Sequence, residues 1–113
     1  MPFEVKERRR AGSVLVLELA GRLTMGANEE LDTALQGLIA KGERGLLLDC
    51  AGIPLIDSQG IQSLVRAVTS VEKRGGKLKL LKLTPRVREV LDLTRLLSVV
   101  EAFEDEEAAL RTF

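Results

Sequence analysis

An aspartate and a serine stand side by side at Asp57 and Ser58, and Gly60 follows closely. The apolar side chains after them recur at the spacing of one helical face: Ile61, Leu64, Val65 and Val68. This spacing predicts that a helix begins at Asp57 and Ser58. The Ser58 hydroxyl would then lie at the surface, beside four backbone N–H groups that have no partner inside the helix and carry partial positive charge. Such a position favours an added phosphate.

A purely structural role is the alternative interpretation of these two residues. Serine and aspartate are among the commonest N-cap residues, because their side-chain oxygens accept hydrogen bonds from the first N–H groups of a helix. The residue types and their spacing therefore leave both roles open, the structural cap and the phosphate acceptor.

Composition excludes several other classes of function. The chain has 113 residues, of which 45% are hydrophobic, so one domain covering residues 1–113 with a single core is expected. Seventeen basic and seventeen acidic residues give a formal net charge of zero, and the chain has no Trp or Tyr. Neither a basic surface nor an aromatic platform is therefore expected, which argues against nucleic-acid binding.

The chain has one cysteine and no histidine. Cys50 ends an apolar run and is expected to be a small buried residue rather than a reactive thiol. Without histidine or a cysteine cluster, the usual transition-metal ligands and the commonest general base are missing, which argues against a metal site and against an enzyme. No internal disulfide can form, and no leader or long apolar span is evident, so a cytoplasmic location without membrane insertion is expected.

The order of the predicted elements indicates an α/β fold that starts with an antiparallel hairpin. Strands are expected over residues 3–10, 14–19, 46–50, 78–83 and 98–101, and helices over 28–41, 58–73, from 85 onward and over 104–110. The basic triplet Arg8, Arg9 and Arg10 is expected to be a solvated strand end or a turn, with a docking role as the less favoured alternative. Alternating strands and helices predict a mixed sheet of four to five strands, with right-handed crossovers and about four helices packed mainly on one face. Ser58 is then expected at the edge of the sheet where partners bind.

From about Val14 to the end, the sequence is similar to the sulfate transporter and anti-sigma factor antagonist (STAS) domain. The strings that carry this resemblance are GRLTMGANEELDTAL, LIDSQGIQSL and RGGKLKLLKLTPRVREVLDLTRLLSVVEAFEDEEAAL. Their most specific part is Asp57 and Ser58 with Gly60. The chain most resembles the small free-standing bacterial anti-sigma factor antagonists of this family.

This resemblance implies a partner-switching role. Members of the family bind an anti-sigma factor that is also a serine kinase, and so release the sigma factor that it holds. The kinase phosphorylates the serine after the motif's aspartate, here Ser58, and a separate serine phosphatase restores binding. ATP and Mg²⁺ would belong to the kinase, so no cofactor is expected. Asp57 is expected to orient the hydroxyl or contact the kinase, and Gly60 to let the partner's backbone approach closely. The expected partner-binding residues are Asp57, Ser58, Gln59, Gly60, Gln62, Thr24 and Met25.

Two positions depart from the family pattern. Gln59 stands where the family usually has a small residue, and it bears on which kinase docks. Thr24 and Met25 stand where many sigma-regulating members have an acidic residue, so the partner surface is expected to differ there too. A monomer or a weak homodimer is expected.

Two other classes of function stay open. Some STAS domains are accessory subunits of membrane transport or lipid-trafficking complexes and dock without phosphorylation. A neighbouring gene for a permease or an ATPase would favour that role. An enzyme is the less favoured class, because the chain has no histidine and no glycine-rich nucleotide loop.

Overall fold

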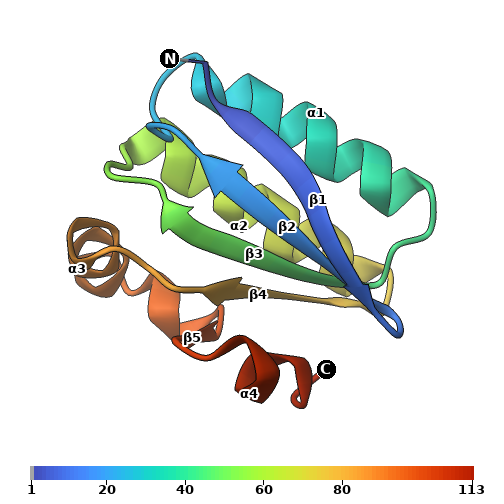
Figure 1. Ribbon diagram of the computed structural model, residues 1–113. Helices are drawn as coiled ribbons and strands as arrows, with labels where there is room; N and C mark the ends of the chain where they lie inside the picture. The colour runs from blue at the N-terminus through green and yellow to red at the C-terminus, as the bar shows by residue number, and fades with distance from the viewer. Residues whose placement is uncertain (1) are drawn as a thin grey trace.

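The computed structural model describes residues 2–113, which form a five-stranded sheet with helices on both faces (Figure 1). The strands are β1 (Glu4–Ala11), β2 (Val14–Ala20), β3 (Gly45–Gly52), β4 (Lys77–Leu81) and β5 (Ala102–Phe103). The helices are α1 (Ala27–Ala40), α2 (Ser58–Lys73), α3 (Pro85–Leu93), the 3₁₀ helix η1 (Leu96–Ser98) and α4 (Glu106–Leu110). The strand order is β1-β2-β3-β4-β5, in which β1 and β2 pair antiparallel and all later pairs are parallel. The expected α/β fold with an N-terminal hairpin is confirmed.

Strand β2 lies inside the sheet, between β1 and β3, and is buried on both faces. Alternate side chains of a strand point to opposite faces. Leu15 and Leu17 join the larger core, which α1, α2 and α3 cover, whereas Val14 and Val16 pack with Ala109 of α4 on the other face. Three helices therefore cover one face, and the short α4 covers part of the other.

The buried stripe of α2 differs from the one that hydrophobicity predicts. Val65 is 42% exposed, although its spacing placed it on the inner face. The inner face instead includes three small residues, Gly60, Ser63 and Ala67, beside Leu64. Small side chains contribute little to a hydrophobicity pattern. The apolar face predicted from the sequence is therefore rotated about the helix axis relative to the face that is buried.

The expected strand over residues 98–101 is wrong. Leu96–Ser98 form η1, and the last strand is β5, which begins at Ala102. The carbonyl oxygen of Leu96 accepts hydrogen bonds from the N–H groups of both Val99 and Val100. These bonds hold the segment in a turn, and the side chain of Val100 is buried in the core rather than in a pleated strand.

The basic triplet lies at the end of β1 and is exposed, as expected, and its side chains also form ion pairs. Arg8 donates to Asp49 of β3 at 2.9 Å and to Glu106 of α4 at 2.8 Å. Arg9 donates to Glu106 at 3.0 Å and to Glu107 at 2.6 Å. The hydrogen bond from Arg8 is the largest influence that holds the pKa of Glu106 below its ordinary value. These pairs tie α4 to the strands beneath it.

We expect Arg8→Met to lower the free energy of unfolding by about 1–3 kcal/mol, because it removes a hydrogen bond from the carboxylate of Asp49, which is only 6% exposed. Arg10→Met is the matched control on the same strand. Arg10 pairs with Glu43 near the surface, so its loss should cost less than about 1 kcal/mol. Urea denaturation of both variants measures the difference. Equal losses would mean that the contacts of Arg8 add nothing beyond a surface ion pair.

Candidate functional site

Asp57 is the N-cap of α2, and its carboxylate joins two separate segments of the chain. Oδ1 accepts hydrogen bonds from the N–H groups of Gln59 and Gly60, both at 3.0 Å, which caps the helix. Oδ2 accepts from the N–H of Met25 at 2.9 Å, in the loop before α1. The N–H of Gly60 is the largest influence that holds the pKa of Asp57 below its ordinary value, and the N–H groups of Met25 and Gln59 act in the same direction.

The loops that follow β2 and β3 run side by side. Their backbones are joined by hydrogen bonds from Gly21 N to Gly52 O (2.9 Å), from Leu23 N to Leu55 O (3.0 Å) and from Asp57 N to Leu23 O (3.2 Å). Leu23 and Ile56 form a parallel bridge between them. This pairing extends the β2–β3 ladder past the ends of both strands, and so brings the loop before α1 against the start of α2.

The structure brings the sequence-predicted site residues to this one end of the sheet, with different degrees of exposure. Ser58 is the first residue of α2 and is exposed, as is Gln62 one turn later. Gln59 and Thr24 are partly exposed, and the side chain of Met25 is 80% exposed. Apart from the buried Gly60, the predicted residues are therefore accessible to a partner.

The structure has the helix cap that the sequence left open as one of two roles, so the N–H groups beside Ser58 are already hydrogen-bonded. The N–H groups of Gln59 and Gly60 bind the Asp57 side chain, and the N–H of Ile61 donates to the Asp57 carbonyl oxygen at 3.0 Å. The positive end of the helix dipole therefore already faces a carboxylate. A phosphate on Ser58 would have to displace Asp57 to reach these donors.

Gly60 has an intramolecular role in the packing of α2. It is buried, and a Cβ built on it would collide with the carbonyl oxygen of Leu23 and lie 2.8 Å from Cγ1 of Ile56. The absence of a side chain lets the first turn of α2 lie directly on the bridge between the two loops. Close approach of a partner's backbone at Gly60 stays a prediction.

Sequence reasoning missed two neighbours of this site, Arg22 and Leu55. The apolar residues Ile53, Leu55 and Ile56 stand close together in the sequence, which favours burial of all three side chains. The two isoleucines are buried, but Leu55 is 39% exposed, and Arg22 is exposed on the adjoining loop. Residues 53–56 are buried, exposed, exposed and buried in turn, which is not the alternation of a strand, so no local pattern identifies the outward position of Leu55.

The chemistry available at this site is that of docking and modification. Within residues 2–113, no group of three His, Cys, Asp or Glu side chains is placed to hold a metal ion. Cys50 is 2% exposed, as expected, and burial raises the pKa of its thiol to about 12. No helix in the described part of the chain has the length and apolar character needed to cross a membrane. The site offers an exposed hydroxyl beside a carboxylate and exposed apolar side chains.

The sequence and the fold are both similar to those of known proteins. Residues 4–109 match the STAS domain family. The chain is 30% identical over 100 residues to BtrV of Bordetella bronchiseptica, a candidate anti-sigma factor antagonist, with 88% of this chain and 86% of BtrV covered. The chain therefore belongs to the STAS domain family, among its anti-sigma factor antagonists. These are regulators without catalytic activity, so the expectation of a protein that is not an enzyme is confirmed.

Two solved structures show the same fold. A candidate anti-sigma factor antagonist of Thermotoga maritima matches with a TM-score of 0.86 and 22% identity, over 97% of this chain and 92% of that one. The phosphorylated form of SpoIIAA of Bacillus matches with a TM-score of 0.72 and 21% identity, over 98% of this chain and 99% of that one.

Two substitutions at Asp57 should distinguish its helix cap from its hydrogen bond with the N–H of Met25. Asp57→Ala removes both and should lower the free energy of unfolding by about 1–2 kcal/mol. Because the folded pKa of Asp57 is lowered, this difference in the free energy of unfolding should be full above about pH 4 and shrink at lower pH, as the carboxyl group takes up a proton.

Asp57→Asn keeps an oxygen for the helix cap, but its amide nitrogen cannot accept a hydrogen bond from the N–H of Met25. We expect wild-type helix capping with faster hydrogen exchange at the Met25 amide; unchanged exchange would mean that Asp57 does not hold this loop.

Gly60→Ala should destabilise the protein by about 1–3 kcal/mol, because the added methyl group collides with Leu23 and Ile56. Gly37→Ala is the matched control. Gly37 lies within α1, and no neighbouring atom comes within 4 Å of the place that a Cβ would take, so alanine should stabilise the protein by about 0.4–1 kcal/mol. Thermal unfolding of the two variants should therefore shift in opposite directions. Equal behaviour would remove the packing role assigned to Gly60.

Proposed function

We propose that this protein is an anti-sigma factor antagonist that is switched by phosphorylation of Ser58. In its unmodified form it binds an anti-sigma factor that is also a serine kinase, which releases the sigma factor. Phosphorylation of Ser58 by that kinase ends the interaction, and a serine phosphatase restores it. ATP and Mg²⁺ act in the kinase, and the cycle takes place in the cytoplasm, where transcription is regulated.

The observation that carries this proposal is the position of Ser58 in a chain of this family. Ser58 is exposed at the first residue of α2, where a kinase can reach its hydroxyl. The exposed side chains of Met25 and Leu55 give the same end of the molecule apolar surface for a partner to cover. SpoIIAA, which has the same fold, has been solved in a phosphorylated form.

The electrostatics of the helix N-terminus support a switch that acts on the complex rather than on the fold. A phosphoserine carries about −1.5 to −2 charges near neutral pH. Because Asp57 already accepts from the N–H groups of Gln59 and Gly60, the phosphate would add its charge beside an existing carboxylate. A partner packed over this surface would have to desolvate both anions, which disfavours docking. The fold keeps its cap throughout, since Asp57 supplies it.

The proposal is tested by pull-down with three baits, wild type, Ser58→Asp and Ser58→Asn, from an extract of the cells that produce the protein. We expect an anti-sigma factor of the serine-kinase type to be retained by wild type and by Ser58→Asn. Its recovery with Ser58→Asp should fall about tenfold or more, because like charges or unpaired charges at an interface cost several kcal/mol. Retention of the same membrane-transport subunits by all three baits would contradict the switch and support a docking role without phosphorylation.

Phosphorylation by the recovered kinase then tests the acceptor residue. Ser58→Ala should abolish phosphate incorporation. Ser13→Ala is the control, because Ser13 is also exposed but lies in the turn between β1 and β2 at the other end of the sheet. Incorporation into Ser58→Ala at the wild-type rate would rule out Ser58 as the acceptor.

A further inference from the structure

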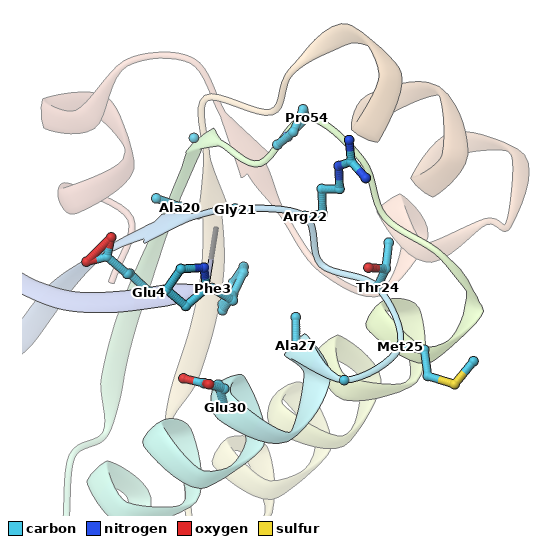
Figure 2. A pocket seen from close by; sticks show the side chains of 13 residues that line it. Phe3, Glu4, Ala20, Gly21, Arg22, Thr24, Met25, Ala27, Glu30 and Pro54 are labelled. Atoms are coloured by element: carbon cyan, nitrogen blue, oxygen red, sulfur yellow. The ribbon is translucent and has the colours of Figure 1, made fainter.

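Met25 carries the most exposed of the large apolar side chains within residues 2–113, with 80% of its surface accessible. Figure 2 shows it at the edge of an open groove, where its side chain extends from the loop before α1 and away from Phe3 and Ala27. The thioether sulfur, Sδ, is therefore open to small molecules in solution. A thioether in such a position is susceptible to oxidation to the sulfoxide.

The backbone that carries this side chain is held in place. The Met25 N–H donates to Oδ2 of Asp57 at 2.9 Å. The carbonyl oxygen of Thr24 accepts hydrogen bonds from the N–H groups of Ala27 at 3.0 Å and Asn28 at 3.3 Å. None of these bonds involves the Met25 side chain, so a chemical change at Sδ leaves the loop and the helix cap intact.

Within the described part of the chain, one other side chain contains sulfur, and it is shielded. Cys50 is 2% exposed, and burial raises the pKa of its thiol to about 12. The thiolate is the form of cysteine that peroxides oxidise, and very little of it is present at neutral pH when the pKa is this high. Oxidation is therefore directed to the docking surface at Met25 rather than to the core.

We propose that Met25 is an oxidation site, and that conversion of its thioether to the sulfoxide by hydrogen peroxide weakens docking of the protein partner. The lone pair of Sδ attacks one oxygen of the peroxide, and the O–O bond breaks as the S–O bond forms. The second oxygen keeps its own proton, takes the proton of the transferred oxygen and leaves as water. Sulfur is oxidised by two electrons, and the peroxide is reduced by the same two.

This modification acts on association because Met25 shares its surface with Ser58. The Asp57 carboxylate that holds the Met25 N–H also caps the helix that begins at Ser58, and Leu55 exposes apolar surface at the same end of the sheet. An unbranched thioether adapts its shape to the apolar surface of a partner. A sulfoxide oxygen loses its hydration when a partner covers it, which costs free energy unless the partner supplies a hydrogen-bond donor. Oxidation therefore disfavours the complex without adding charge.

The inference rests on the proposed function for the identity of the partner, but not for the reactivity of Met25. The first measurement accordingly needs only the purified protein and hydrogen peroxide. Peptide mapping by mass spectrometry should find one added oxygen atom on the peptide that contains Met25, before any oxidation of Cys50. The thermal unfolding midpoint should be unchanged. Earlier oxidation of Cys50, or a lower midpoint for the oxidised protein, would overturn the proposal.

Binding of the partner gives the decisive comparison. Catalase removes the peroxide before the treated protein meets the anti-sigma factor that the wild-type bait retains. Oxidised wild type should bind this partner about tenfold more weakly than untreated wild type. Met25→Leu is the matched control, and its binding should be the same before and after treatment. No loss in wild type, or an equal loss in Met25→Leu, would overturn the proposal.

The phosphorylation switch and the oxidation site fail in different assays. Retention of the partner by Ser58→Asp would contradict the switch alone, because Met25 is unchanged in that variant. Full binding by oxidised wild type would contradict the role of Met25 alone, because Ser58 is unmodified in that sample.

Discussion

The carboxylate of Asp57 holds together the two loops from which the candidate site is built. One oxygen caps α2, and the other binds the backbone of Met25, in a segment that precedes α1. A single side chain thus fixes the helix that carries Ser58 relative to the loop that carries Thr24 and Met25. Since all three donors are backbone N–H groups, the arrangement depends on the chain path and on one acidic residue, and it tolerates variation of the side chains around it.

This arrangement separates the stability of the fold from the properties of the docking surface. Beneath Asp57, Gly60 lets α2 lie against the backbone of Leu23, and the contacts there are buried. Above it, Ser58, Met25 and Leu55 are exposed. In the proposed switch, charge added at Ser58 would act mainly on this exposed surface. A switch of this kind needs no change of fold, because the free energy that it alters is that of association.

Ion pairs are distributed unequally over the two ends of the sheet. Arg8 and Arg9 are paired with Asp49, Glu106 and Glu107, and they attach α4 to the second face. At the other end, Glu4, Glu30 and Arg22 border a groove that adjoins the candidate site. Charges of the first group stabilise the fold, whereas Glu4, Glu30 and Arg22 form no ion pair within residues 2–113.

The sequence by itself determined the class of fold and the start of α2, because these depend on hydrophobic periodicity and on local capping chemistry. Only the tertiary structure decided what surrounds Ser58. The pairing of residues 21–23 with 52–57 is a contact between segments about thirty residues apart, which no local pattern encodes. That pairing exposes Leu55, gives Asp57 a second partner at Met25, and puts Gly60 against Leu23. The sequence indicated the residues of the candidate site, and long-range backbone hydrogen bonds determine which of them are exposed and which face the core.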